Sequence, residues 1–262
     1  MLAIARQLSS DFFGLRRVCG FPFAARWLAQ VARHLPTCIK RRDLQPADLA
    51  FGRGPVRAKL GDAEAQLIGN CVVTGMREIW VRDCYLGDGF LTIPDSATVV
   101  DLGANIGVFT MLALAQGTNV RAIAVEPNHD AARFIEEAAR LNGFQDRLQV
   151  CRAFLGGRTS TQDELAAMTD YTGSAFISED EFVRRYNLAK IDFLKCDIEG
   201  SEFQLLTPAS KLLAMSRQLS IELHTAMGDT NAFAKMLESL GFEVVVRHSS
   251  PHDCVLNARR RS

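Results

Sequence analysis

Residues 99–110 have the sequence VVDLGANIGVFT, which predicts a buried strand, a tight turn and the first turns of a helix. The run from Ala97 to Leu102 is short, apolar and rich in β-branched residues, whereas the apolar residues between 108 and 115 recur at helical spacing. Gly103 and Gly107 allow the backbone to turn without a Cβ, and the helix behind them offers unpaired N–H groups. This stretch is therefore a candidate turn for a nucleotide-type cofactor.

The spacing of the turn indicates which cofactor it suits. It follows D-x-G-x-N-x-G, not the G-x-G-x-x-G of a dinucleotide turn, which favours S-adenosylmethionine over NAD. Asp101 is placed to anchor the turn or to meet the ammonium group of the ligand, and Asn105 to hydrogen-bond locally in a strained conformation. The alternative is an ordinary strand-to-helix turn with glycines present by chance.

Glu126 follows a second apolar run, about 20 residues after the glycine turn. A carboxylate at this position can accept hydrogen bonds from both hydroxyls of a ribose. Pro127 suits the first turn of the next helix, and with Asn128 it completes the predicted cofactor-binding set. NAD enzymes also place an acid here, and the alternative is a solvent-exposed acid favoured by the helix dipole.

The composition of the 262-residue chain is that of a globular protein, with 48% hydrophobic and 23% charged residues and no net charge. The charge is unevenly distributed. Residues 1–42 contain eight lysines and arginines against one acid, Asp11, so this part carries +7 and the rest of the chain carries −7.

The seven cysteines form no C-x-x-C pair and no cluster with histidine at metal-ligand spacing, which is typical of buried thiols in a reducing compartment. No run of about 18 apolar residues is present, and Arg6, Ser9 and Asp11 interrupt any signal-peptide core. We therefore expect a cytoplasmic protein, with peripheral attachment to the inner membrane face as a further option. Its oligomeric state is not predicted.

The N-terminal arm, residues 1–47, has apolar residues at helical spacing, which predicts two short amphipathic helices on either side of Pro22. Their apolar faces are expected to contain Leu8, Phe12, Leu15 and Cys19, then Phe23, Trp27, Val31 and Leu35. Such helices either cap a catalytic domain or contact an anionic membrane surface through residues 1–35. No nucleic-acid partner is expected, because no recognisable nucleic-acid module is present.

Residues 48–94 contain short alternating runs, which predict a small β-rich lead-in. Strands are expected at 56–60, 65–68 and 71–74. Residues 78–85 mix aromatic and charged side chains, and this pattern fits either a helix or a strand. Trp80 and Tyr85 either line an acceptor pocket or pack against the edge of the sheet.

Residues 95–258 alternate strands and helices, which predicts an α/β fold with a doubly wound, mainly parallel sheet. Further strands are expected at 148–153, 190–196 and 218–224, with 242–246 and 253–256 as a closing antiparallel pair. Residues 155–172 are rich in Gly, Ser and Thr and are expected to form a surface excursion. Because ligands bind at the carboxyl ends of parallel strands, the acids that end these strands should share one cleft.

A second polar stretch, Asp197-Ile198-Glu199-Gly200-Ser201-Glu202, follows the strand at 190–196, and the next strand ends in Glu222-Leu223-His224. Gly200 makes a turn, and Ser201 is a favourable N-cap for the helix after it. A hydroxyl acceptor needs a base to take its proton, and Asp197, Glu199 and His224 are the candidates.

His224 is the preferred base, because its unperturbed pKa of about 6.5 suits this role. Asp197 or Glu199 would then orient the imidazole. Alternatively, Glu199 is a structural acid at a helix start and His224 is a hydrogen-bonded packing residue. A divalent metal held by the three side chains is a further alternative, but their spacing does not support one and no metal is expected.

Three stretches resemble the FkbM-type family of S-adenosylmethionine-dependent methyltransferases: VVDLGANIGVFT, AVEPN at 124–128 and, most specifically, IDFLKCDIEGSE at 191–202. Ser201 stands where alanine is common in that family. The resemblance covers residues 78–245 and gives no support for the arm or for residues 155–175. It implies a Rossmann-like methyltransferase sheet of seven strands and O-methylation of hydroxyls on sugars or other secondary metabolites.

The leading prediction is therefore an S-adenosylmethionine-dependent methyltransferase, with the methyltransferase domain at residues 95–258. Its partner would be a small-molecule or glycan hydroxyl acceptor, methylated by in-line transfer with help from a base. The alternative is a catalytically weak, methyltransferase-like interaction module. An NAD-dependent oxidoreductase would need a G-x-G-x-x-G turn in place of the one at residues 101–107.

Overall fold

A computed structural model of the chain describes residues 2–261, with side chains described from residue 7 onward. Its centre is a seven-stranded sheet in the order β10-β11-β9-β8-β3-β4-β5. The strands are β3 (Thr98–Leu102), β4 (Arg121–Val125), β5 (Leu148–Cys151), β8 (Phe193–Cys196), β9 (Gln218–His224), β10 (Phe242–Ser249) and β11 (Asp253–Arg260). Neighbours from β9 to β5 are parallel, while β11 is antiparallel to β9 and to β10. The predicted mainly parallel sheet and its closing antiparallel pair are confirmed.

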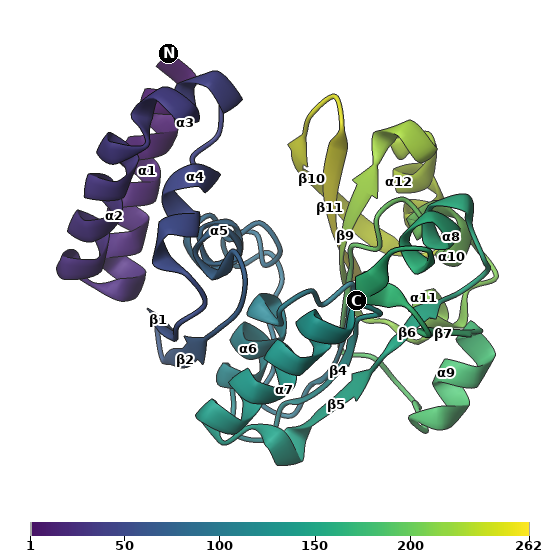
Figure 1. Cartoon of the computed structure of the whole chain (residues 1–262). Helices are drawn as coiled ribbons and strands as arrows, with labels where there is room; N and C mark the ends of the chain where they lie inside the picture. The colour runs from purple at the N-terminus through teal and green to yellow at the C-terminus, as the bar shows by residue number, and fades with distance from the viewer. Residues whose placement is uncertain (1, 262) are drawn as a thin grey trace.

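Helices cover both faces of this sheet (Figure 1). On one face lie α6 (Val108–Ala115) and α7 (His129–Asn142), and on the other α9 (Glu179–Arg185), α10 (Glu202–Leu205), α11 (Lys211–Met215) and α12 (Thr230–Ser239). Alternation along the strands separates two cores, because Val99 of β3 belongs to the cluster under α6 and Val100 to the cluster on the opposite face. The result is the three-layer arrangement of a doubly wound α/β domain.

The N-terminal arm forms a further layer outside α6. It consists of α1 (Leu2–Cys19), α2 (Phe21–Arg33), α3 (Leu35–Arg41) and α4 (Gln45–Asp48). The two predicted amphipathic helices are present, and they separate at Gly20, whose φ of 87° suits glycine. Trp27 and Val31 are buried as expected, whereas Leu35 is 44% exposed and does not belong to the inward face.

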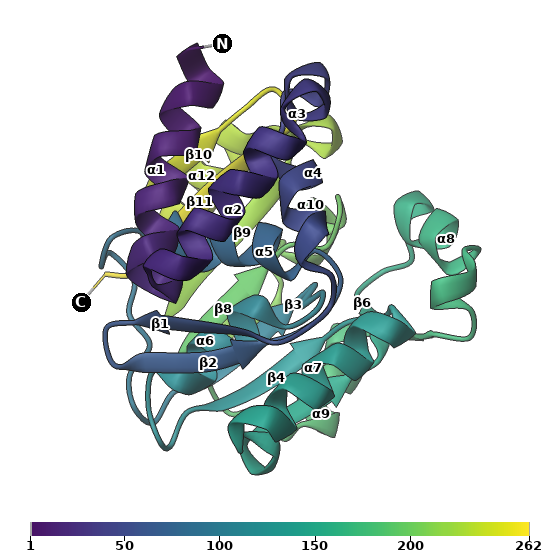
Figure 2. The ribbon, with the colours of Figure 1, turned by 60° about the vertical axis from the view of Figure 1, so that its left-hand side comes forward.

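The lead-in contains β1 (Val56–Leu60) and β2 (Ala63–Leu67), an antiparallel hairpin that lies across α6 (Figure 2). The expected strand at 71–74 is wrong, because this run forms helix α5 (Val72–Met76), followed by a π-helical turn (Arg77–Val81). A short apolar run has no period that separates a strand from a buried helix. The undecided segment 78–85 is thus helical at its start.

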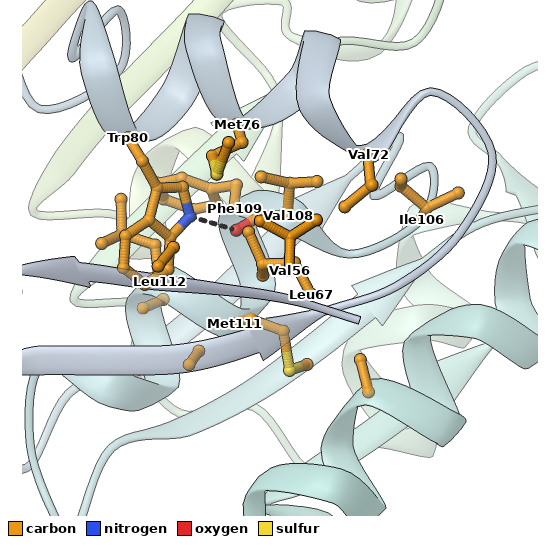
Figure 3. Close-up of a cluster of buried hydrophobic side chains, with 14 of the residues drawn as sticks. Val56, Leu67, Val72, Met76, Trp80, Ile106, Val108, Phe109, Met111 and Leu112 are labelled. Atoms are coloured by element: carbon orange, nitrogen blue, oxygen red, sulfur yellow. Dashed lines mark hydrogen bonds between the residues drawn. The ribbon is translucent and has the colours of Figure 1, made fainter. Parts of the chain in front are cut away.

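A continuous hydrophobic cluster joins the lead-in to the sheet domain (Figure 3). Trp80 is fully buried, and its indole N–H donates to the Val108 carbonyl oxygen at 3.2 Å, at the start of α6. Met76 and Leu67 are also buried in this cluster, together with Phe109 of α6. Trp80 therefore packs inside the core against the start of α6, a position that differs from both of the placements expected from its sequence.

The excursion after β5 contains a second small sheet of β6 (Ala153–Leu155) and β7 (Ala175–Ile177), with α8 (Ser160–Ala166) between them. Figure 2 shows α8 at the outer edge of the molecule. Within the described residues, no helix combines the length and apolar character needed to cross a membrane.

Candidate active site

The glycine turn after β3 is held by the neighbouring strand ends. Gly103 and Ala104 both donate their N–H groups to the Val125 carbonyl oxygen at 3.0 Å. Gly103 has a φ of +71°, and a Cβ on it would lie 1.6 Å from the carbonyl oxygen of Asp197. Only glycine fits there, because the turn after β8 approaches the turn after β3 so closely.

Two of the predicted cofactor residues, Asp101 and Gly107, lie behind the glycine turn, within the core. Asp101 is fully buried and accepts a hydrogen bond of 2.5 Å from the Thr110 hydroxyl, while the Lys195 ammonium lies 3.4 Å from its other oxygen. Gly107 has a φ of 81° and packs against Ile135. Neither residue lines the two cavities described below, so this placement favours anchoring, the first of the two alternatives for Asp101.

Glu126 joins the turn to the next strand. Its two carboxylate oxygens accept the backbone N–H groups of Asn105, at 2.8 Å, and Asn128, at 2.7 Å. Burial raises the pKa of Glu126 to about 7, against the lowering effect of these hydrogen bonds. The Asn128 side chain caps α7 by accepting from Ala131, so Pro127 lies before the helix and not in its first turn as predicted.

Lys195 is the cation at the centre of the site. Its ammonium donates to the Gly103 carbonyl oxygen at 2.7 Å and lies 3.7 Å from the Asp197 carboxylate. Burial lowers the pKa of Lys195, but the carboxylates of Asp101 and Asp197 more than compensate and raise it above the ordinary value. Lys195 is therefore a fixed positive charge between the turns after β3 and β8.

The carboxylates of Asp197 and Glu222 and the hydroxyl of Tyr85 lie close together near Lys195. The Tyr85 hydroxyl donates to Glu222 at 3.1 Å and lies 3.4 Å from Asp197. Burial raises the pKa of both acids, and the charge of Asp197 helps to bring the pKa of Glu222 to about 7. One of the two therefore holds or releases a proton near neutral pH, which is what a general base requires.

His224 has a different environment from the one expected of a base. Its Nε2 lies 3.3 Å from Glu199 and its Nδ1 lies 3.1 Å from Glu202. Hydrogen bonds to these two acids raise the pKa of His224 to about 11, so the ring is an imidazolium at neutral pH and has no lone pair to accept a proton. His224 also lines neither cavity, so its surroundings do not favour the predicted role of base.

The turn after β8 is stabilised by a different residue from the one predicted. Ser201 occupies the N-cap position of α10, but its hydroxyl pairs with Thr159, and the Glu202 carboxylate instead accepts the N–H groups of Ile198 and Gly200. Glu199 has a φ of 53°, and 70% of its side chain is exposed although it pairs with His224.

One set of potential metal donors is found among the described residues: Asp197, Glu202 and His224, each with a donor atom within 4.8 Å of the others. Glu202 replaces Glu199 of the set considered from the sequence. A metal needs a neutral imidazole, and the hydrogen bonds around His224 favour its protonated form. We assign no metal to these residues.

Two adjoining cavities open at this edge of the sheet. The larger has a volume of about 780 Å³ and is lined by Tyr85, Lys195 and Glu222. The smaller has a volume of about 150 Å³ and is lined by Glu126, Pro127 and Glu199. Both include Gly103, Asn105, Asn128 and Asp197, so most of the predicted residues do meet in one place.

Lys195 and Glu222 are functional candidates that sequence reasoning missed. Each lies two residues before a strand-end residue that was singled out, Asp197 and His224 respectively, and therefore on the same face of its strand. The available signal was a charged residue between two apolar residues of a strand, Leu194 and Cys196 for Lys195, and Ile221 and Leu223 for Glu222. Tyr85 was considered as a pocket residue, and the structure places it there.

Comparison with known proteins connects these features to a family. A family model described as "Methyltransferase FkbM domain" matches residues 101–244, from the glycine turn to β10. A 31-O-demethyl-FK506 methyltransferase, FkbM, from Streptomyces tacrolimicus is 25% identical over 239 residues, covering 75% of this chain and 89% of that protein. The AMB antimetabolite synthetase AmbE of Pseudomonas aeruginosa is 25% identical over 234 residues, covering 66% of this chain but 11% of that synthetase.

Solved structures give weaker matches. A methyltransferase FkbM from Methylobacillus flagellatus is 18% identical, with a TM-score of 0.49, covering 89% of this chain and 60% of that one. An Aeropyrum pernix fibrillarin in complex with S-adenosyl-L-methionine is 14% identical, with a TM-score of 0.44, covering 66% of this chain and 71% of that one.

Proposed function

The chain belongs to the FkbM family of methyltransferases, and on that premise we propose that it transfers the methyl group of S-adenosylmethionine to a hydroxyl oxygen of a small molecule, sugar or glycan. Membership of this methyltransferase family confirms the cofactor expected from the sequence. The observation that carries the proposed reaction is the pair of carboxylates, Asp197 and Glu222, that share the Tyr85 hydroxyl in a cavity bordered by the glycine turn.

The residues around the smaller cavity fit the parts of this cofactor. Each oxygen of Glu126 accepts one backbone N–H and keeps a second lone pair, which a ribose hydroxyl can use. Phe154 and Tyr171, whose stacked rings are 5.9 Å apart between centroids, offer a flat apolar wall for the adenine. The turn at Gly103 and Asn105 would receive the amino-acid end, and the bound cofactor supplies an electrophilic methyl group.

In this proposal a side chain of the protein removes the proton of the acceptor hydroxyl. The new carbon–oxygen bond would form as the carbon–sulfur bond of the cofactor breaks, which leaves S-adenosylhomocysteine as a neutral thioether. The acceptor hydroxyl gives its proton to Glu222, which becomes a neutral acid. Asp197 favours this step, because two neighbouring carboxylates are less stable when both are ionised. Lys195, 3.7 Å from Asp197, lowers the pKa of that carboxyl against the larger effect of burial and so opposes the uptake of two protons by the pair.

The charged side chains that line the larger cavity limit which acceptors can bind there. Seven acidic side chains line it: Glu78, Asp83, Asp130, Asp170, Asp197, Glu222 and Asp253. Three lysines and arginines also line it: Arg82, Lys195 and Arg247. An acceptor with a phosphate or sulfate group would be repelled, so we propose a neutral or cationic hydroxyl compound. The hydroxyl acceptor also agrees with the relative from Streptomyces, whose name describes methylation at an oxygen.

The test has two stages. Calorimetry with S-adenosylmethionine and with S-adenosylhomocysteine measures cofactor binding, and a catalytically weak interaction module would bind neither well. Incubation with methyl-labelled cofactor and fractionated extract of the host then identifies the acceptor, with label expected in neutral or cationic compounds. Binding without transfer to any hydroxyl compound would overturn the proposed reaction, and label found only in phosphorylated acceptors would overturn the charge argument.

A further inference from the structure

The outer face of the arm carries an unusual share of exposed apolar side chains. Among the side chains described, ten large hydrophobic ones are exposed, and six of these lie in a stretch of 37 residues: Phe13, Phe21, Leu28, Leu35, Ile39 and Leu49. Phe21 is 60% exposed and Ile39 is 48% exposed. The inward face of the same helices is already occupied by buried residues such as Trp27 and Val31, so this outer face is a second apolar surface.

Four of these six residues lie along α2 and α3. Phe21, Leu28 and Leu35 are seven residues apart, and Ile39 follows four residues later. At 3.6 residues per turn, Phe21, Ala25, Leu28 and Ala32 fall within an arc of roughly 60° on α2, and Leu35 and Ile39, four residues apart, share one face of α3. α2 ends and α3 begins at His34, which donates its N–H to the Gln30 carbonyl oxygen and accepts from the Cys38 N–H, both at 2.9 Å. We call this surface the outer apolar row.

A row of cations follows the outer apolar row at the same spacing. Arg26, Arg33 and Lys40 are also seven residues apart and lie on the solvent side of the apolar row, next to it on the helix. All three are exposed, as are Arg41 and Arg42 at the end of α3. No aspartate or glutamate occurs between Asp11 and Asp43, so no acid on these helices neutralises the row.

The combination of an apolar row and a row of cations favours one kind of partner. A second copy of the chain would place the same uncompensated cations against each other. A nucleic acid would use the cations but would leave the apolar row in water. An anionic lipid surface satisfies both rows at once, because apolar side chains enter the boundary of the acyl chains while arginine and lysine reach the headgroups.

We propose that the outer face of α2 and α3 binds an anionic membrane surface, with Phe21, Leu28, Leu35 and Ile39 inserted and Arg26, Arg33 and Lys40 on the lipid phosphates. The arm would connect the membrane surface to the larger cavity through one ion pair. Arg82, which lines the larger cavity, pairs with Asp11 of α1 at 2.7 Å. Membrane binding would thus hold the cavity at a fixed place relative to the lipid surface.

The experiment is co-sedimentation of the full chain with phosphatidylcholine vesicles, with and without phosphatidylglycerol, at low and high salt. Binding is expected only with the anionic lipid and should weaken as salt is added. Leu28→Ser combined with Leu35→Ser should reduce binding about tenfold or more, since two inserted apolar side chains are lost. Arg33→Glu combined with Lys40→Glu should have a comparable effect at low salt.

The matched control is Leu141→Ser combined with Met168→Ser, which replaces two side chains of similar exposure outside the arm and should leave vesicle binding unchanged. Cofactor binding, measured for every variant, shows that the fold is intact and keeps this test separate from the proposed reaction. Absence of binding to anionic vesicles at low salt would overturn the proposal. So would tighter binding to a polynucleotide that depends on Arg33 and Lys40 but not on Leu28 and Leu35.

Discussion

The protein contains two buried clusters of charged side chains. Both combine acidic with basic residues, but only in the first do the positive charges match the negative ones. The first joins the arm to the lead-in through Arg77, which is 1% exposed and contacts Asp11 at 2.6 Å and Asp48 at 2.5 Å. Arg82 adds a second cation on Asp11, and the Trp27 indole N–H donates to Asp48 at 2.7 Å. Two carboxylates are thus matched by two guanidinium groups and further donors.

The second cluster, at the carboxyl ends of β3, β8 and β9, is not balanced. Lys195 stands alone against Asp101, Asp197 and Glu222, and the pKa of the last two is raised by burial. A balanced buried cluster has no reason to exchange protons, whereas an unbalanced one has a carboxylate that takes up and gives back a proton near neutral pH. The comparison indicates that the excess of acids, and not burial alone, distinguishes the proposed reaction site from the structural cluster.

The largest expected effect is on turnover. Glu222→Gln keeps the shape of the side chain but removes its ability to accept a proton, so turnover should fall by about 10²–10⁴-fold with cofactor binding retained. Steady-state kinetics and calorimetry measure the two quantities. Glu243→Gln, at an exposed position on β10, is the control. Normal turnover in Glu222→Gln would transfer the base role to Asp197, which Asp197→Asn tests.

Substitutions in the balanced cluster around Arg77 should change the free energy of unfolding. Arg77→Met leaves Asp11 and Asp48 buried without their shared cation, which should lower the free energy of unfolding by about 3–5 kcal/mol. Chemical denaturation measures this loss. In the triple variant that adds Asp11→Asn and Asp48→Asn, most of the stability should return, since no unpaired charge stays buried. If Arg77→Met alone were neutral, the cluster would not hold the arm in place.

Glu126 is intermediate between the two clusters. It is a buried carboxylate whose partners are backbone N–H groups and not cations. Glu126→Ala should weaken S-adenosylmethionine binding by about 1.5–3 kcal/mol, roughly 10–150-fold, because hydrogen bonds to a charged group are lost. Calorimetry measures the change, and Glu136→Ala on the exposed side of α7 is the control. Unchanged cofactor affinity would mean that the ribose lies elsewhere.

The pH dependence of the reaction offers a test of the unbalanced cluster. Because the pKa of Glu222 is raised to about 7, its basic form disappears as pH falls below that value. The value of kcat/KM should therefore decrease about tenfold for each pH unit below 7 and level off above it. Tyr85→Phe removes a hydrogen bond that favours ionised Glu222, so the midpoint should move to higher pH. A flat profile from pH 5 to pH 8 would contradict the assignment.

Much of the fold could be predicted because its signals are local. The change from an apolar run to helical spacing at Gly103 marks a strand, a turn and a helix without knowledge of any other part of the chain. Where the run was too short, as at residues 71–74, helix α5 was mistaken for a strand. The exposure of Leu35 was missed because its spacing fits either of two helix faces, and only the packing of the arm decides between them.

The site was predictable only in part, because its chemistry depends on which strands are neighbours. Asp197 and Glu126 end their strands, and their positions in sequence were sufficient to place them in the cleft. Lys195 and Glu222 lie inside strands, and their meeting requires β8 to lie between β3 and β9. The sequence favours His224 as the base because it does not show that His224 pairs with Glu199 and Glu202, which come from the preceding turn and helix.

The smallest expected effect on turnover belongs to His224, and it would refine the comparison of the two clusters. His224 pairs with two carboxylates, so by charge balance it resembles the structural cluster even though it lies next to the reaction site. His224→Gln keeps a donor toward Glu202 and should lower turnover by less than about tenfold, far below the effect expected for loss of a base.

The stability of this variant should depend on pH in a specific direction. Because folding raises the pKa of His224 from about 6.5 to about 11, protonated His224 stabilises the folded state fully below pH 6.5, and this contribution declines as pH rises toward 11. The difference in unfolding free energy between the natural chain and His224→Gln should therefore be largest in mild acid and shrink in alkaline solution. Denaturation curves at a series of pH values measure it, with Glu199→Gln as the partner variant. A turnover loss above 100-fold with a pH-independent stability difference would return the base role to His224 and would show that pairing with two acids does not exclude a residue from the chemistry.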